Sequence, residues 1–237
     1  EVDAWALRSH RLASEAWNED KMKLGLVSIF DRNGLLLLDR DECLRPDIEL
    51  DQLSRLGPAF AETGKHGFDQ IALRKYPHLE GIEHVHTTGN IAERADGAAL
   101  LLIGNREEGK EQGLRPRARI VSGAGAAADA TLMFAAPSLA VKKALKLAGM
   151  KKTDIGIWEC DETFAAVALK FQRDLDIPEE RLNVNGGTIA TGHAKGATGA
   201  ILLAGLLDEM ENRDIETGCV ALSASGGLAV ATIVERA

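Results

Sequence analysis

The stretch from residue 183 to residue 199, NVNGGTIATGHAKGATG, constrains this chain more than any other, because five of its residues are glycines. Glycine adopts backbone angles that other residues resist, and it lets a loop approach a ligand closely. An apolar helical pattern follows at once, at Ile201, Leu202, Leu203, Leu206 and Leu207. His193 therefore lies on a tight loop at the start of a helix, where it is a candidate catalytic residue. The alternative is a tight turn with an incidental histidine.

The bulk properties of the chain exclude some classes of protein. A length of 237 residues predicts one large domain or two small ones. A net charge of −8 argues against nucleic acid as the main partner. No apolar run reaches membrane-spanning length, so we expect no membrane insertion. Cys43, Cys160 and Cys219 are odd in number and widely spaced, which favours the cytoplasm or another reducing compartment and no metal cluster.

Hydrophobic periodicity and turn residues predict the order of the elements. In the first part of the chain we expect a helix over 1–23, a hairpin or short strands over 26–38, a helix over 47–56 and a long loop over 59–90. A buried strand over 96–103, a short helix over 107–113 and a strand starting at 118–122 should follow. The rest should contain a helix over 136–149, a strand over 154–159 with a helix to about 175, and strands over 218–222 and 228–234. In the helix over 136–149, the residues expected to face inward are Leu139, Ala140, Ala144, Leu145 and Leu147. Strand, helix and strand thus alternate, which predicts an α/β fold.

The long loop over 59–90 contains three histidines within nine residues, His78, His84 and His86. Beyond Glu80 and Glu83, no carboxylate or cysteine stands at a supporting spacing, so we expect no metal site there. A long loop inside a compact domain more often has a role in binding.

Three short segments resemble the active-site loops of the thiolase family. They are Asp161-Glu-Thr-Phe-Ala165, the segment 185–196 with Gly192-His-Ala-Lys-Gly196 at its end, and Ser223-Ala-Ser-Gly-Gly227. In thiolases these loops read Asn-Glu-Ala-Phe, Gly-His-Pro-x-Gly and Cys-x-Gly-Gly. Upstream, the segments 6–10, 41–46, 56–60 and 88–99 resemble the family's loop region and the strand after it. The resemblance therefore spans nearly the whole chain.

The resemblance implies a layered αβαβα fold of two similar halves, here lacking most of the N-terminal half. Residues 1–90 would be the remainder of the loop domain with coenzyme A-binding segments, 91–121 the last part of the N-terminal half, and 122–237 the C-terminal domain. The family's nucleophilic cysteine belongs to the missing half, which we expect as a partner in the same or a separate chain. None of the three cysteines matches it. A dimer or tetramer is also implied.

The resemblance also implies catalytic roles. His193 matches the histidine that activates the nucleophile and donates to a thioester oxygen in an oxyanion hole. Ser223 stands where thiolases carry their second cysteine, the acid/base acting on the α-carbon. Asp161 replaces the asparagine that holds a water in an oxyanion hole, and a charged carboxylate there would oppose catalysis. Ser225 occupies the position whose backbone N–H completes the second oxyanion hole.

Coenzyme A thioesters are the implied substrates, and no covalently bound cofactor is expected. The positions that match residues contacting coenzyme A are Arg45, Phe60, Ala92, Thr163 and Phe164. Ala92 replaces a serine, and Glu93 beside it replaces a glycine. We therefore expect a thiolase-like acyltransferase chain with altered loops. The alternatives are a non-catalytic subunit that binds acyl-CoA or a partner protein, and a partner-dependent carbon–carbon lyase acting on coenzyme A esters.

Overall fold

The computed structural model describes residues 1–21 and 25–237, and its centre is a four-stranded sheet. The strands are β3 (Ala118–Ala127), β4 (Ile157–Cys160), β5 (Thr217–Ala224) and β6 (Leu228–Arg236), in the order β3-β6-β5-β4. The pairs β3–β6 and β6–β5 are antiparallel, and β4–β5 is parallel. The mixed sheet with helices around it confirms the predicted α/β class.

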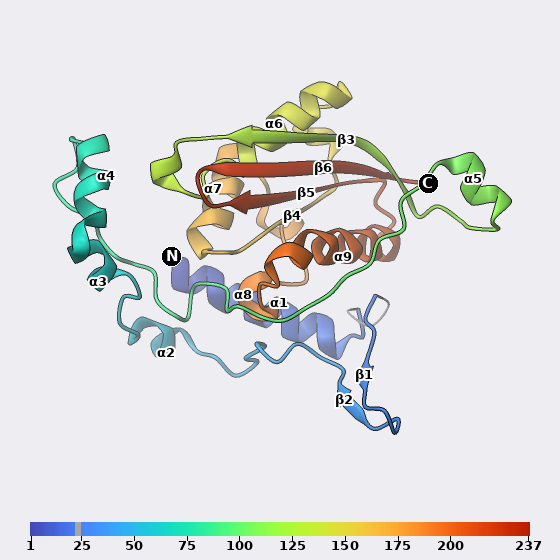
Figure 1. Ribbon diagram of the computed structural model, residues 1–237, viewed down its shortest axis with the longest axis horizontal. Coiled ribbons are helices and arrows are strands. Elements are labelled where there is room, and N and C mark those ends of the chain that lie inside the picture. Colours follow the sequence, from blue (N-terminus) through green and yellow to red (C-terminus); the bar gives the residue numbers. More distant parts are fainter. Residues whose placement is uncertain (22–24) are drawn as a thin grey trace.

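Helices cover both faces of this sheet (Figure 1). On one face lie α6 (Pro137–Ala148) and α7 (Ala165–Leu175), whose buried residues share a core with Trp158, Cys219 and Ile233 of the strands. On the other face lies α9 (Thr198–Asn212), packed against Ile157, Val220 and Val234. Gly218 on β5 allows this close packing, because a β-carbon there would lie only 2.8 Å from Leu206 Cδ2 and from Met210 Sδ.

The helix α1 (Val2–Asn18) packs against α7 and the short helix α8 (Thr188–Thr191). Its buried face carries Trp5, Ala6, Ser9, His10, Ala13 and Ala16. The predicted helix over 1–23 is therefore confirmed but shorter, and its last two positions lie outside the described residues. Because α8 is part of the glycine-rich stretch, α1 supports that stretch from outside the sheet.

The segment between α1 and the sheet has little regular structure. It contains the hairpin β1 (Ile29–Phe30) and β2 (Leu36–Leu38), the helices α2 (Leu50–Ser54), α3 (Ala61–Thr63), η1 (Gly64–Phe68), α4 (Asp69–Lys75) and α5 (Arg106–Glu111). Short turns of helix elsewhere are η2 (Ala130–Leu132), η3 (Lys152–Asp154), η4 (Glu179–Arg181) and η5 (Lys195–Ala197). The predicted hairpin is confirmed, whereas the predicted loop over 59–90 is partly helical.

Two predictions about apolar residues are wrong. The run 96–103 forms no strand, and Leu100 is 94% exposed. A strand needs a neighbour for its N–H and C=O groups, and the described residues place none beside this run. In α6, Leu139 and Leu147 are exposed while Val141 is buried. The buried residues of α6 recur every three or four positions, and Leu139 and Leu147 fall off that face.

Candidate active site

The carboxylate of Asp161 joins two of the predicted catalytic loops. Asp161 directly follows β4, Ser223 lies near the end of β5, and the two parallel strands end at the same edge of the sheet. Asp161 Oδ2 accepts hydrogen bonds from Ser223 Oγ at 2.7 Å and Thr163 Oγ1 at 2.6 Å. Its Oδ1 accepts from the Ser223 backbone N–H at 2.5 Å. The fully buried Asp161 side chain is thus held by three donors.

His193 is held in the same region by its backbone and by its ring. Its N–H donates to Glu93 O at 2.8 Å, and its carbonyl accepts from Ala95 N at 3.3 Å. Its ring Nδ1 is 3.0 Å from the hydroxyl of Thr198, the first residue of α9. Burial lowers the pKa of His193 below its usual value, and the negative charge of Asp161 opposes that shift. The lowered pKa favours the neutral imidazole, the form that can accept a proton.

The segment 91–95 runs between the Asp161 and His193 loops. Ala92 N donates to Thr163 O at 3.2 Å, and isolated bridges pair Ile91 with Phe164 and Arg94 with His193. Ala92, predicted to contact coenzyme A, thus lies where the two loops meet.

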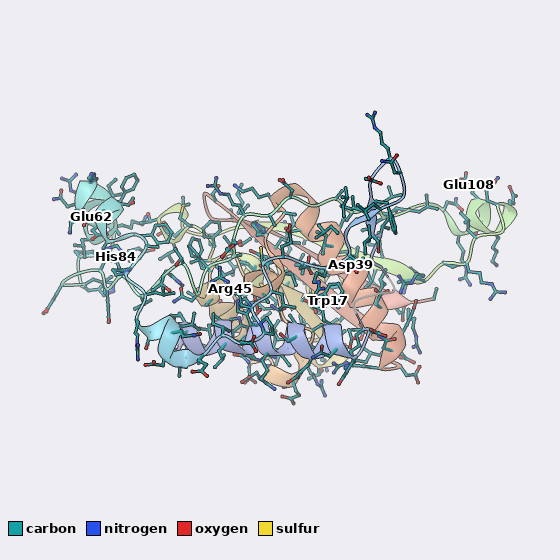
Figure 2. All side chains as sticks on the ribbon, turned by 90° about the horizontal axis from the view of Figure 1, so that it is seen from below. Trp17, Asp39, Arg45, Glu62, His84 and Glu108 are labelled. Carbon is teal, nitrogen blue, oxygen red and sulfur yellow. The ribbon has the colours of Figure 1, made fainter. Side chains whose placement is uncertain are left out.

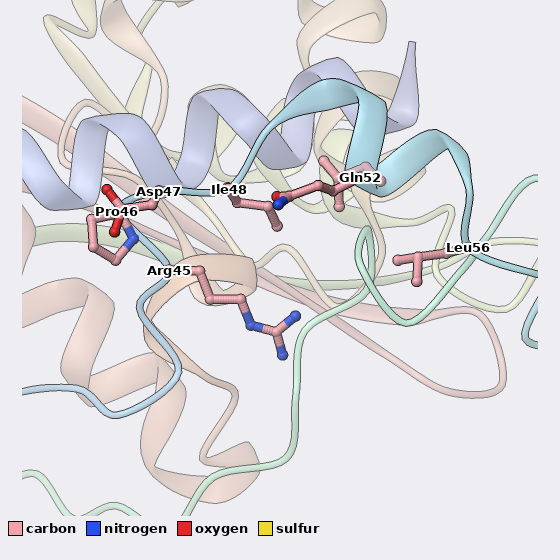
Figure 3. A pocket seen from close by; sticks show the side chains of 7 residues that line it. Arg45, Pro46, Asp47, Ile48, Gln52 and Leu56 are labelled. Atoms are coloured by element: carbon pink, nitrogen blue, oxygen red, sulfur yellow. The ribbon is translucent and has the colours of Figure 1, made fainter.

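Arg45 lines a cavity of about 380 Å³ beside α2 (Figure 3). The other lining residues are Pro46, Asp47, Ile48, Gln52, Leu53 and Leu56. The guanidinium of Arg45 forms an ion pair with Glu93. An anionic ligand at Arg45 would therefore have to compete with this carboxylate.

Phe60 and Phe164 line a second cavity, of about 360 Å³. The ring of Phe164 lies 5.7 Å from Phe60, 5.2 Å from His86 and 5.3 Å from Phe134, measured between centroids. The remaining lining residues are Leu132, Met133, Ala135, Ala166, Val167 and Lys170. Of the predicted coenzyme A-binding residues, Arg45 lines the first cavity, and Phe60 and Phe164 line the second. Ala92 and Thr163 line neither cavity and are joined by a backbone hydrogen bond.

Ser225 lies in the exposed turn between β5 and β6. No hydrogen bond among the described residues links it to His193 or Asp161. The turn is fixed by Gly227, which has φ +79° and whose carbonyl accepts from Ala128 N at 2.7 Å. Its role in an oxyanion hole stays a prediction.

The environments of the three cysteines raise the pKa of each thiol. Cys160 and Cys219 are fully buried, and burial raises the pKa of both thiols. Cys43 is partly exposed, and burial together with the charge of Glu93 raises its pKa. Each environment disfavours the reactive thiolate.

The residue that the sequence predictions missed is Glu162. Its carboxylate is fully buried and accepts from Trp5 Nε1 at 2.9 Å, Ser9 Oγ at 2.7 Å, Asn183 Nδ2 at 2.9 Å and Ile189 N at 3.3 Å. It thus ties α1 to the glycine-rich stretch. The available signal was its place two residues after the end of the strand β4.

Of the histidines in the predicted loop, His84 lies at one end of the molecule and His86 lies beside Phe164. Figure 2 shows His84 and Glu62 at that end, Glu108 at the opposite end, and Arg45 between them. His84 Nε2 is 3.0 Å from Asp69 Oδ2, and His86 Nδ1 is 2.8 Å from Asn90 Oδ1. Among residues 1–21 and 25–237, no cluster of three metal-ligating side chains is found.

Among the same residues, no helix has the length and apolar character needed to cross a membrane.

His10 is a buried histidine that contacts Arg45, and its titration is expected to make the stability of the fold depend on pH. Its Nδ1 accepts from Arg45 N at 3.2 Å, and burial with the nearby Arg45 charge lowers the pKa of His10 to about 4. Because the unfolded chain binds this proton more readily, His10 stabilises the fold above about pH 6.5, and that contribution is lost as pH falls toward 4. We expect a loss of about 3 kcal/mol from this residue.

Urea titrations at pH 7 and pH 4.5 would measure this loss. His10→Asn keeps an acceptor for Arg45 N but does not titrate, so its stability should depend less steeply on pH. An equal dependence in both proteins would rule out His10 as the source.

Comparison with known proteins identifies the class. The thiolase N-terminal domain family matches residues 1–67, and the thiolase C-terminal domain family matches residues 114–236. The chain is 35% identical over 240 residues to a 3-ketoacyl-CoA thiolase of Photobacterium profundum, covering 99% of this chain and 57% of that protein. It is also 35% identical over 240 residues to a probable acetyl-CoA acyltransferase of Staphylococcus aureus, covering 100% of this chain and 56% of the relative.

A solved structure agrees with these matches. The crystal structure of the Bacillus anthracis acetyl-CoA acetyltransferase superimposes with a TM-score of 0.85 at 32% identity, covering 100% of this chain and 55% of that one. The fold is therefore the layered α/β fold of the thiolases, as predicted. The chain belongs to the thiolase family, and it spans a little more than half the length of these relatives.

Proposed function

We propose that this chain forms the coenzyme A-binding and acid–base part of a thiolase-type acyltransferase. The observation that supports the proposal is the pair of hydrogen bonds from Ser223 to Asp161 where β4 and β5 end, together with segment 91–95, which pairs with the loops of Phe164 and His193. The substrates are acyl-CoA and acetyl-CoA, in Claisen condensation or thiolytic cleavage. The names of the similar proteins, 3-ketoacyl-CoA thiolase and acetyl-CoA acyltransferase, support this class of reaction.

In the cleavage direction, a cysteine thiolate from the N-terminal thiolase half attacks the ketone carbon of a 3-ketoacyl thioester. The carbon–carbon bond breaks, the acetyl-CoA carbanion takes a proton, and the thiol of a second coenzyme A removes the acyl group. In this proposal His193 takes the proton of the nucleophilic thiol and donates a hydrogen bond to the thioester oxygen. Its lowered pKa favours the neutral, proton-accepting form. Ser225 contributes its backbone N–H.

Two differences from the thiolase loops, at positions 161 and 223, lower the expected activity. Ser223 would have to exchange the proton of the α-carbon, and a hydroxyl is a far weaker acid than a thiol. Its proton is directed to Asp161 Oδ2 rather than to an open site. Asp161 as a carboxylate adds negative charge where a negative oxyanion develops.

Two alternative functions follow from the same differences at positions 161 and 223. A non-catalytic subunit would keep the acyl-CoA site without the chemistry. A partner-dependent lyase would break a carbon–carbon bond of a coenzyme A ester without an acyl-enzyme. We place the protein in a reducing compartment such as the cytoplasm and expect a dimer or tetramer.

Mass spectrometry after incubation with acetyl-CoA separates these functions. We expect the 237-residue chain alone to stay unmodified, because burial disfavours all three thiolates. The protein completed with the N-terminal thiolase half should gain one acetyl group. If the completed protein also stays unmodified, acyl transfer is wrong.

Binding of coenzyme A gives an independent prediction. Arg45→Gln should weaken binding about tenfold to 100-fold, because a charge-assisted hydrogen bond to a phosphate is lost. Glu93→Gln should strengthen binding, because the competing carboxylate is neutralised. Calorimetric titration of each variant with coenzyme A measures both effects.

The matched control is Arg55→Gln, which removes an equally charged, exposed side chain paired with Asp51. It should bind coenzyme A as the parent does. Equal losses in both arginine variants would point to overall charge rather than to a phosphate contact at Arg45.

A further inference from the structure

The hydrogen bond between Ser223 and Asp161 makes the serine oxygen an acceptor. A hydroxyl has one proton and two lone pairs. The proton of Ser223 is donated to Asp161 Oδ2 at 2.7 Å, and among the described residues no hydrogen bond occupies the two lone pairs of Ser223 Oγ. Ser223 is half-buried, whereas Asp161 is fully buried. A small molecule in the site would therefore meet the serine oxygen, with the carboxylate behind it.

The carboxylate of Asp161 is oriented to receive the serine proton. Thr163 Oγ1 donates to Oδ2 at 2.6 Å, and the backbone N–H of Ser223 donates to Oδ1 at 2.5 Å. These contacts fix the plane of the carboxylate. The proton of Ser223 needs to move only along its existing hydrogen bond, whose length lies within the range for proton transfer to a general base. A group that gives a proton to Ser223 Oγ would thus pass one on to Asp161.

The negative charge of Asp161 opposes some reactions and suits others. In Claisen chemistry the carboxylate would stay charged while an oxyanion develops nearby, which is unfavourable. In a reaction where Asp161 takes up a proton, its negative charge is lost as the oxyanion forms, so the net charge of the site does not change. A carboxylate at position 161 therefore suits a reaction that needs a general base.

We propose that Ser223 and Asp161 together form a general base that activates water to hydrolyse an acyl-CoA thioester. The water oxygen bonds to the thioester carbonyl carbon, a water proton moves to Ser223 Oγ, and the serine proton moves to Asp161 Oδ2. The carbon–sulfur bond then breaks, and the coenzyme A thiolate takes a proton back from Asp161 through Ser223. The products are a carboxylic acid and coenzyme A, and no acyl group remains on Ser223.

This reaction rests on the proposed function for the binding of acyl-CoA, but it needs no cysteine. His193 keeps the role proposed above, as a donor to the thioester oxygen. Ser223, a poor acid because its proton is directed to Asp161, is for the same reason a suitable acceptor for a proton from water.

The test measures the acetate that the protein completed with the N-terminal thiolase half releases from acetyl-CoA in water enriched with heavy oxygen. Condensation and thiolytic cleavage release no free acid, so labelled acetate reports hydrolysis alone. Ser223→Ala and Asp161→Asn should each lower kcat for acetate release at least about 100-fold, while KM for acetyl-CoA stays the same. Calorimetric titration with coenzyme A shows whether each variant is folded and binds.

The matched control is Ser138→Ala. Ser138 Oγ donates to Asp174 Oδ2 at 2.6 Å, the same type of contact, but the serine is only 2% exposed and lies between α6 and α7. This variant should release acetate as the parent does. Equal losses in Ser138→Ala and Ser223→Ala would assign the effect to stability and overturn the proposal.

Further outcomes separate this proposal from the proposed function. If coenzyme A does not bind to the parent protein, the proposed function fails and this proposal with it. If coenzyme A binds but no acetate is released, only hydrolysis is wrong. If acetate release persists in Ser223→Ala or in Asp161→Asn, the acid comes from another route, such as an acyl-cysteine, and the proposal is overturned.

Discussion

Replacing Glu162 by alanine is expected to destabilise the fold by about 3 to 5 kcal/mol, the largest effect on stability of any single change considered. The fully buried carboxylate accepts hydrogen bonds from Trp5, Ser9, Asn183 and Ile189, which belong to α1 and the glycine-rich stretch. Its removal would leave these donors buried and unpaired, at about 1 to 3 kcal/mol each before relaxation. Urea unfolding followed by tryptophan fluorescence measures the loss.

The control is Glu15→Ala on α1, where the exposed carboxylate pairs with Arg11. An exposed pair of this kind contributes less than about 1 kcal/mol. Glu162→Ala within about 1 kcal/mol of the parent would show that the buried donors find water or other partners.

Replacing Asp161 by asparagine and Ser223 by cysteine, the residues of the thiolase loops that these positions resemble, is expected to give the largest gain in activity. Ser223→Cys alone supplies a thiol with an ordinary pKa near 8.5, but the neighbouring Asp161 carboxylate disfavours its thiolate. Asp161→Asn removes that charge and keeps an oxygen for the Ser223 backbone N–H. We expect the double variant to cleave a 3-ketoacyl-CoA at least about 100-fold faster, the usual contribution of a working acid/base group. The assay is the thiolytic cleavage rate of the protein completed with the N-terminal thiolase half.

The single variants provide the internal control. If the two changes act through the contact between their side chains, the gain of the double variant should exceed the product of the single gains. Purely multiplicative gains would mean that the 2.7 Å hydrogen bond between Asp161 and Ser223 does not limit catalysis. No gain in any variant would favour the non-catalytic subunit.

Much of the C-terminal fold was predictable because its signals are local. Residues 165–175 and 198–212 have helical apolar spacing, Gly149 ends α6 in a left-handed conformation with φ +68°, and the turn after Ser223 separates two strands. The approach of Asp161 to Ser223 could be predicted from the resemblance, and it follows physically because the parallel strands β4 and β5 end at one edge.

The sequence did not predict features that depend on distant partners. The apolar run 96–103 has the composition of a buried strand, but a strand exists only where another chain segment pairs with it. Glu162 gave no local sign of its four donors, since two of them come from α1, more than 150 positions away. The Tyr76–Asp129 contact likewise joins segments 53 positions apart.

Glu93 contacts both Arg45 and His193, and it therefore connects the expected phosphate site to the histidine loop. Its side chain neutralises Arg45 and its carbonyl oxygen holds the N–H of His193. A phosphate arriving at Arg45 would release the side chain of the same residue whose main chain positions the histidine. Binding of a phosphate at Arg45 could then change the position of His193, because Glu93 contacts both residues.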